Sequence, residues 1–252
     1  MSAALKVISL NIEHSKHLAR VETFLRREKP DVACVQEIFE RDVPRISAAC
    51  GGAEYRFAQM TRHIKETPPA IMGIAVFSLL PITKTSIRYY RGDAEHIPDF
   101  DSNDPATFQR KSHPCLFCDV TYAGNRFRIG TTHFTWTPDG KPDATQRTDI
   151  VHLLAALEEM GEFVLAGDFN APRGGEIFDV LATKFKDNVP PHYTTSIDPS
   201  LHRAGKTRPQ ELADKMVDGI FSTPHYVVSD VTLVPGVSDH LALVAMVSTA
   251  DT

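Results

Sequence analysis

The segment Gly167-Asp168-Phe169-Asn170 carries the side chains in this sequence that are best suited to phosphate chemistry. It follows residues 163–166, an apolar run typical of a strand. Alternation along an extended strand would place Asp168 and Asn170 on one side and Phe169 on the other. A carboxylate beside an amide can hold a hydrated magnesium ion, a phosphate oxygen or an attacking water. The alternative is a turn after a strand, in which Asp and Asn make only local hydrogen bonds.

The segment Ser238-Asp239-His240, which we expect to open the last strand, offers a carboxylate next to an imidazole. This pairing supplies an acid–base group and its electrostatic partner. The alternative is a capped turn at the start of a strand. Gly236-x-Ser238 is reminiscent of a serine nucleophile motif, but that motif needs a glycine where His240 stands. We therefore exclude a serine hydrolase.

Further polar residues lie in or at the ends of apolar, strand-like segments: Asn11, Glu37 after Gln36, His133 and Asp218. Taken singly, Glu37 also fits a solvated strand end, and His133 fits a histidine of the core or of a sheet edge. Glu37 follows an apolar strand at the position where α/β sheets bind their ligands. Asp218 interrupts an apolar strand, and a buried carboxylate without a partner is costly. We expect a histidine to be that partner.

Strands and helices alternate along the first third of the chain, and strand hairpins follow. The predicted strands cover residues 5–12, 31–38, 55–60, 70–78, 82–90, 115–122, 126–136, 162–169, 216–222, 226–235 and 238–248. The predicted helices begin at Leu18, Phe39, Asp143 and Ile177, and Asp143 and Gln146 fit a capping box. This order fits an α/β protein with two stacked sheets and helices outside, in one domain over residues 1–252.

Two long polar segments, residues 91–112 and 190–210, lie between elements that carry these polar residues. Loops of this length within a compact domain are usually functional or disordered. We expect both to face the substrate.

The composition is that of an ordinary globular protein, with 42% hydrophobic residues and a formal net charge of −5. The mild acidity argues against a protein that mainly coats nucleic acid. The longest uncharged stretch, Thr67–Thr83, is too short and too rich in proline to span a membrane. We find no signal peptide and expect a cytoplasmic monomer.

The cysteines at positions 34, 50, 115 and 118 do not form a disulfide framework in a chain of this length. Cys115-x-x-Cys118 fits half of a zinc site or a redox pair, but no second such pair exists. Because the surrounding segment is strand-like, we expect buried, inert thiols.

The motifs occur in a fixed order along the chain: Asn11 in LNI, Glu37 in VQE, His133 in TTH, Asp168 and Asn170 in GDFN, Asp218 in VDGIF, and Asp239 and His240 in SDH. This ordered set resembles the endonuclease/exonuclease/phosphatase superfamily, also called the deoxyribonuclease I-like fold. The resemblance implies a four-layered α/β sandwich of two packed, mainly antiparallel β-sheets flanked by helices. It also implies phosphate-ester hydrolysis that depends on a divalent metal.

The resemblance implies that Glu37 binds the metal, with Asn11 beside it, and that Asp239 completes the metal side of the site. The implied ion is Mg²⁺ or Mn²⁺, which oxygen ligands suit.

For the reaction itself, the resemblance implies that Asp168 activates or orients the attacking water and that Asn170 binds the phosphate. His133 would contact the phosphate and protonate the leaving oxygen. His240 would be the second imidazole at the phosphate, oriented by Asp218.

The substrate is less defined. A tryptophan before GDxN and a Trp-Cys-Asp-Arg block mark the inositol polyphosphate phosphatases, and both are missing here. No dense basic loop indicates an abasic-site endonuclease, although short basic segments at 56–65, 88–91, 110–111 and 203–208 could line a phosphate groove. Arg173 is the best single candidate for an extra phosphate contact, and it equally fits ordinary surface charge.

We expect a nuclease-type hydrolase of phosphodiester bonds, with nucleic acid among its candidate partners. Phosphomonoesters, nucleotide-derived small molecules and lipid headgroups are alternative substrates. A binding module that has kept the fold but lost turnover is the alternative from another class.

Overall fold

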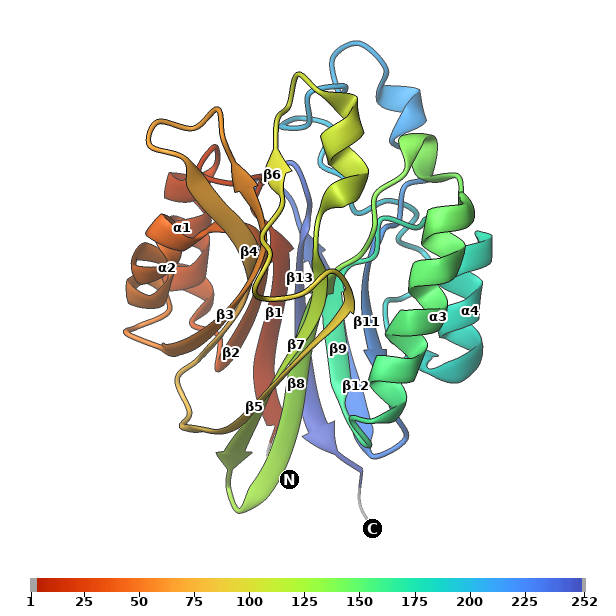
Figure 1. Ribbon diagram of the computed structural model, residues 1–252. Coiled ribbons are helices and arrows are strands. Elements are labelled where there is room, and N and C mark those ends of the chain that lie inside the picture. The colour runs from red at the N-terminus through yellow and green to blue at the C-terminus, as the bar shows by residue number, and fades with distance from the viewer. Residues whose placement is uncertain (1–3, 251–252) are drawn as a thin grey trace.

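The computed structural model describes residues 4–250, which form two stacked β-sheets with helices on both outer faces (Figure 1). The first sheet has seven strands in the order β12-β13-β1-β2-β4-β3-β6. Its strands are β1 (Ala4–Asn11), β2 (Val32–Phe39), β3 (Glu54–His63), β4 (Ala70–Ser78), β6 (Asp99–Phe100), β12 (Tyr226–Val234) and β13 (Ala242–Thr249).

The second sheet has six strands in the order β10-β11-β9-β8-β7-β5. Its strands are β5 (Ile82–Arg91), β7 (His113–Tyr122), β8 (Asn125–His133), β9 (Val164–Asp168), β10 (Lys186–Asp187) and β11 (Asp218–Ser222). Most neighbouring strands in both sheets run antiparallel, and the parallel pairs are β1–β2, β3–β6 and β8–β9.

Four α-helices complete the outer layers (Figure 1). Helices α1 (Leu18–Glu28) and α2 (Val43–Ala49) pack on the seven-stranded sheet, and α3 (Ala144–Glu158) and α4 (Glu176–Lys184) pack on the six-stranded sheet. Short 3₁₀ turns, η1 to η4, cover Glu40–Asp42, Pro105–Arg110, Pro138–Gly140 and Pro209–Glu211. The predicted four-layered sandwich is confirmed. None of the helices within residues 4–250 combines the length and apolar character that a membrane crossing requires.

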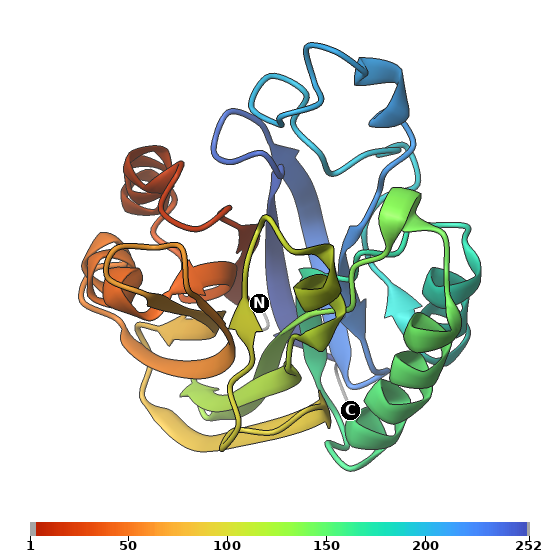
Figure 2. The ribbon, with the colours of Figure 1, turned by 45° about the horizontal axis from the view of Figure 1, so that its top comes forward.

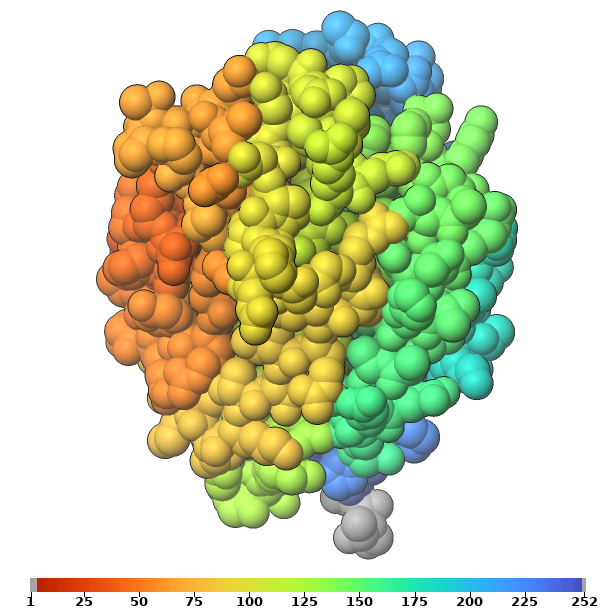
Figure 3. Space-filling view, viewed as in Figure 1, coloured from red at the N-terminus to blue at the C-terminus, as the bar shows by residue number. Residues whose placement is uncertain are grey.

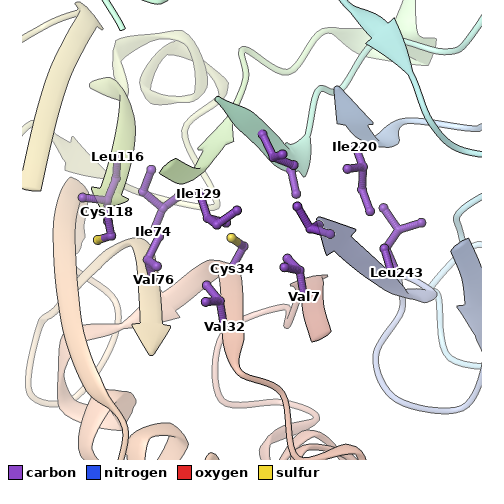
Figure 4. Packing of buried hydrophobic residues seen from close by; sticks show 14 of the residues in the cluster. Val7, Val32, Cys34, Ile74, Val76, Leu116, Cys118, Ile129, Ile220 and Leu243 are labelled. Atoms are coloured by element: carbon purple, nitrogen blue, oxygen red, sulfur yellow. The ribbon is translucent and has the colours of Figure 1, made fainter. Parts of the chain in front are cut away.

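The inner faces of the two sheets meet in a core of aliphatic side chains (Figure 4). Residues of the seven-stranded sheet such as Val7, Val32 and Ile74 face Leu116 and Ile129 of the six-stranded sheet. These residues alternate with side chains that face the helices, which is the pattern expected of strands covered on both sides.

The cysteines are free and buried, as predicted. Cys118 faces the core between the sheets, whereas Cys115 faces the helices α3 and α4. Because the two thiols point to opposite faces of β7, they cannot share a zinc ion or form a disulfide. Burial raises the pKa of each to about 12, which keeps both as unreactive thiols.

Strand register brings the predicted polar residues to one end of the sandwich, at the top of Figure 1. In the six-stranded sheet, His133 pairs with Asp168, and Asp168 pairs with Asp218 on its other side. In the seven-stranded sheet, Asn11 at the end of β1 pairs with Gln36 of β2. Residues from 25 (Asn11 and Gln36) to 50 (Asp168 and Asp218) positions apart in the sequence therefore lie side by side.

Several predicted element ends are wrong: the helix expected from Phe39 begins at Val43, and the strand expected to reach residue 136 ends at His133. Two further differences bear on the site. Ser238-Asp239-His240 precedes the last strand, which starts at Ala242. Glu37 does not end its strand, because β2 continues to Phe39 across a β-bulge between Val35 and Ile38. A bulge redirects a side chain out of the regular alternation, so Glu37 turns toward the end of the sandwich.

Several long loops gather at this end of the sandwich (Figure 2). The connection from β5 to β7 carries β6 and η2, and in the space-filling view it covers the face between the two sheets (Figure 3). The connection from β10 to β11, residues 188–217, rises on the other side (Figure 2).

Candidate active site

Asp168, Asp218 and His240 form the centre of the site, and one ligand atom of each lies within 4.8 Å of the others. His240 Nδ1 is 2.7 Å from Asp218 Oδ2, which makes the histidine the partner that the buried Asp218 needs. The opposite nitrogen, Nε2, lies 3.9 Å from Asp168 Oδ2. The imidazole is thus held on one side and presents its other nitrogen to the catalytic centre.

His133 lies on the other side of Asp168. Its Nε2 is 3.6 Å from Asp168 Oδ2 and 3.5 Å from Glu37 Oε1. Its buried Nδ1 has no hydrogen-bond partner within the part of the chain that the structure describes. The two imidazoles of His133 and His240 therefore flank one carboxylate.

Asn11 and Asn170 fix the orientation of the Asp168 carboxylate. Asn11 Nδ2 donates to Asp168 Oδ2 at 3.1 Å, and the Asn170 backbone N–H donates to Asp168 Oδ1 at 2.8 Å. The Asn170 side chain in turn donates from Nδ2 to the carbonyl of Phe134 at 2.9 Å. The local hydrogen bond expected of a turn is present at Asp168, which also lies at the centre of the site, and its role toward a metal, phosphate or water stays a prediction.

The expected alternation across Asp168 and Asn170 is wrong, because β9 ends at Asp168 and Asn170 has φ of 49°. Glu13, His14 and Glu37 also have positive φ, between 46° and 61°. Left-handed backbone is unfavourable for residues other than glycine and is common at active sites. The four strained residues all belong to this end of the sandwich.

A second group lies beside the first and consists of Glu13, His17 and Asp239, again within 4.8 Å of one another. His17 Nε2 is 3.0 Å from Glu13 Oε2, and the Glu13 backbone N–H donates to Asn11 Oδ1. His14 Nε2 lies 3.5 Å from Glu37 Oε2.

Sequence reasoning missed Glu13, His14 and His17. The signal that could have identified them is their place directly after the first strand, at the same strand-end position that drew attention to Asn11.

The charges of the acidic side chains are unequal. Burial alone would raise the pKa of Glu37, but His14 and His133 outweigh it and hold that pKa well below its ordinary value. Burial raises the pKa of Asp239 to about 7; His240 opposes the rise, and Glu13 and Glu37 add to it. The surroundings of Asp239 thus disfavour the ionised form of its carboxyl unless a cation offsets the negative charge.

The central group is also perturbed. Burial and the neighbouring Asp218 raise the pKa of Asp168. Burial lowers the pKa of His133. Burial would lower the pKa of His240 too, but Asp218 raises it well above the ordinary value. The surroundings therefore favour the protonated form of His240 and the neutral form of His133.

A divalent cation fits the residues present. Glu13 and Asp239 offer carboxylate oxygens together with one imidazole from His17, and the amide of Asn11 is nearby. The charge of Glu37 also acts on Asp239. Carboxylates dominate this donor set, and such oxygens favour Mg²⁺ or Mn²⁺. The carboxylates clustered around Asp239 would attract such an ion electrostatically.

Part of the 190–210 loop supports the site instead of facing a substrate, which corrects our expectation for this segment. Ser196 Oγ accepts hydrogen bonds from the backbone N–H groups of Val217 and Asp218, and its carbonyl accepts one from Leu241. The N–H of Asp198 donates to the carbonyl of Asp239. These bonds fix the segments that carry Asp218 and His240.

Arg173, the predicted phosphate contact, is not brought into this group. Its guanidinium donates to the carbonyls of Val189, Pro190 and Tyr193 and lies 2.8 Å from the Asp187 carboxylate. The arginine holds the start of the 188–217 connection, and we withdraw it as a substrate-binding residue.

Lys111, from one of the short basic segments, is the cation that the structure places near the site. Its Nζ lies 4.6 Å from the ring centroid of Phe100, and it takes part in no ion pair within residues 4–250. Burial lowers the pKa of Lys111, whereas the negative charges of Glu37 and Asp168 oppose that shift. The ammonium therefore lies within electrostatic range of the acidic centre.

Comparison with known proteins agrees with this geometry. The sequence model of the Endonuclease/Exonuclease/phosphatase family matches residues 8–240, which contain all of the central residues. The chain belongs to this family. No curated protein matches the sequence of this family member.

Solved structures of the family share its fold at low sequence identity. The endonuclease/exonuclease/phosphatase from Bacteroides vulgatus superposes with a TM-score of 0.72 at 15% identity, covering 98% of this chain and 100% of that one. The human Nocturnin catalytic domain gives 0.68 at 19% identity, over 98% and 94% of the two chains. The mannosyl-6-phosphatase of Bacteroides thetaiotaomicron gives 0.66 at 15% identity, over 98% and 100%.

Proposed function

We propose that this family member is a divalent-metal-dependent phosphoesterase whose residues 1–252 act as one catalytic domain. The observation that carries the proposal is the arrangement of His133 and His240 on either side of Asp168, beside a separate group of metal-binding character. A phosphate ester needs its charge neutralised, a water directed at phosphorus and a leaving oxygen stabilised. The two groups supply these functions together.

His240 binds a non-bridging phosphate oxygen in this proposal. Asp218 orients its Nδ1 and favours the protonated ring, so that Nε2–H points toward the centre as a charged donor. A charged donor gains strength as negative charge accumulates on phosphorus-bound oxygens. Removing either partner would lose both orientation and charge.

Asp168 orients the attacking water, since its carboxylate is fixed by Asn11 and by the backbone of Asn170. His133, next to Asp168 and Glu37, contacts the phosphate on the leaving-group side. Asn170 contributes through the turn that it forms, because its own amide is engaged by the Phe134 carbonyl.

The metal would be held by Glu37 and Asp239, with Glu13 and His17 adjoining and Asn11 beside them. When bound, it supplies Lewis-acid stabilisation of the phosphate and its leaving oxygen. The donor set is the support for this assignment, and Mg²⁺ or Mn²⁺ is the proposed ion.

We propose phosphodiesters as the substrate class, in small or single-stranded molecules instead of duplex nucleic acid. The loop from β5 to β7 at the mouth of the site is mostly acidic, and acidic surface repels a long polyanion. Its charged side chains are Asp93, Glu95, Asp99, Asp101, Asp104, Arg110 and Lys111. We also propose that the protein is a monomer and is located in the cytoplasm.

Metal removal tests the function directly. After treatment with EDTA, we expect hydrolysis of bis(p-nitrophenyl) phosphate to stop and then to return with Mg²⁺ or Mn²⁺. Release of p-nitrophenol measures the rate, and a Glu37→Gln, Asp239→Asn variant is the control for unspecific metal effects. Full activity in EDTA, or recovery with stoichiometric zinc alone, would overturn the proposal.

A further inference from the structure

Six aromatic rings form a continuous row along one side of the candidate active site. Neighbouring ring centroids lie between 4.5 and 6.2 Å apart, the spacing of stacked and edge-on aromatic pairs. In order, the rings are Phe39, His14, His63, Phe100, Phe108 and Trp136. The row connects β2 and β3 of one sheet, through β6 and η2, to the loop that follows β8 of the other sheet.

The inner end of the row lies in the catalytic region. His14 is 3.5 Å from Glu37, and Phe100 carries the Lys111 ammonium 4.6 Å from its ring centroid. Because the charges of Glu37 and Asp168 both act on Lys111, a phosphate bound at the centre would come within the field of the ammonium. The rings therefore start where the reacting phosphate is proposed to bind.

The outer end of the row reaches the surface at Trp136, the single tryptophan of the chain, which is 44% exposed. Trp136 follows His133 by three residues, and the carbonyl of the intervening Phe134 binds the Asn170 amide. An exposed tryptophan this close to the site is available to a part of the substrate beyond the phosphate.

The chemistry around the outer rings suits a flat ring better than a sugar. Gln109, next to Phe108, donates from its side-chain amide to Asp143, and its backbone carbonyl accepts from Arg91. The side-chain donor next to Phe108 is thus already used, whereas sugar hydroxyls need several free hydrogen-bonding partners. A nucleobase has a π-face that stacks on tryptophan without such partners.

We infer that Trp136, backed by Phe108, is a base-binding subsite of the proposed phosphoesterase, with Lys111 toward the phosphate. The inference rests on the proposed function for the hydrolysis of the bound ester. Binding of the base at Trp136 does not depend on that function. The ligand is a purine or pyrimidine base attached to a phosphate ester, as a free nucleotide or in a short single strand.

Binding can be measured without turnover, because the fluorescence of the single tryptophan reports on its own surroundings. In EDTA, AMP should quench this fluorescence saturably, while ribose 5-phosphate should not. A four-nucleotide single strand that binds more tightly than AMP would identify a strand as the source of the base, and equal affinity would identify the mononucleotide. No quenching by any of them, or equal quenching by ribose 5-phosphate, would overturn the subsite.

Kinetics supplies the second test, using a short oligonucleotide and the same strand with abasic residues. We divide kcat/KM for the intact strand by kcat/KM for the abasic strand. This ratio should fall about 10-fold in Trp136→Ala, which is the usual scale of base stacking on an aromatic ring. Trp136→Phe should retain most of the ratio. Tyr122→Ala, which removes an aromatic side chain of 38% exposure from the β7–β8 turn, is the matched control.

An equal loss on both strands in Trp136→Ala would contradict a base-binding role. If wild-type protein hydrolyses no ester with Mg²⁺ or Mn²⁺, the proposed function fails while the fluorescence titration still decides the subsite.

Discussion

At the scale of single residues, the contact between His240 and Asp218 sets the orientation of the imidazole and favours its charged form. They are 22 positions apart in the sequence and 2.7 Å apart in the structure, where both are buried. A buried carboxylate next to an imidazole favours the charged ring. The two residues therefore form one ion pair instead of two independent groups.

We predict that His240→Ala lowers kcat by about 10²–10⁴-fold, the usual worth of a positioned acid–base group. Asp218→Asn should reproduce much of this loss because orientation and charge are lost together. The double variant should cost little more than His240→Ala alone, since residues that act as a unit are not additive. His152→Ala, on the exposed face of α3, is the control.

Steady-state hydrolysis of a generic diester measures each rate. Fully multiplicative losses would place the role of Asp218 elsewhere, and near wild-type turnover in His240→Ala would remove the histidine from catalysis.

At the scale of elements, close strand contact sets the position of the site. A Cβ on Gly167 would lie 2.2 Å from the carbonyl oxygen of Thr132, so only glycine allows β9 to lie this close to β8. The glycine thereby places Asp168 beside His133. A sequence pattern shows that a glycine is present but not which backbone it approaches.

The β7–β8 hairpin is held by a buried ion pair at cross-strand neighbours. Arg128 binds Asp119 through Nε at 2.6 Å and Nη2 at 2.9 Å, and its Nη1 donates to the Met160 carbonyl after α3. Breaking a buried pair leaves an uncompensated charge. We predict that Asp119→Ala lowers the free energy of unfolding by about 3–5 kcal/mol.

Urea unfolding followed by circular dichroism measures the change. Arg126→Ala is the matched control, because this exposed arginine lies 3.7 Å from the same carboxylate and should contribute about 1 kcal/mol or less. Equal effects of the two substitutions would contradict the special role of the buried pair.

At the scale of the whole molecule, the site joins the two sheets. Glu13, Glu37 and Asp239 come from segments next to the seven-stranded sheet, and Asp168 and Asp218 come from the six-stranded sheet. Their negative charges crowd together when no cation is bound. A cation at this junction should therefore stabilise the fold as a whole.

We predict that Mg²⁺ or Mn²⁺ raises the Tm. At a concentration of about 100 Kd, binding to the folded state alone adds about 2.7 kcal/mol to the free energy of unfolding. For a protein of this size that corresponds to roughly 5–10 °C. Differential scanning calorimetry with and without EDTA measures the shift, which should vanish in Glu37→Gln, Asp239→Asn. An unchanged Tm in the wild type would contradict the metal site.

The sequence by itself determined the sandwich and most of its elements. Period-two and helical patterns are local, so they predicted β1, β4 and α1 closely, and the Asp143 cap of α3 is present with a 2.8 Å bond to the Gln146 N–H. The ordered motifs also predicted which residues should meet, although their catalytic roles remain predictions.

Only the tertiary structure decided which further side chains join them and which do not. Glu13 and His17 reach Asp239 because the turn after β1 is left-handed, and Arg173 is diverted to the carbonyls of a distant loop. Lys111 and Trp136 are connected through the rings of Phe100 and Phe108, which come from β6 and η2. Such convergence depends on strand register, a bulge and loop packing, whose energies come from long-range contacts that no local pattern encodes.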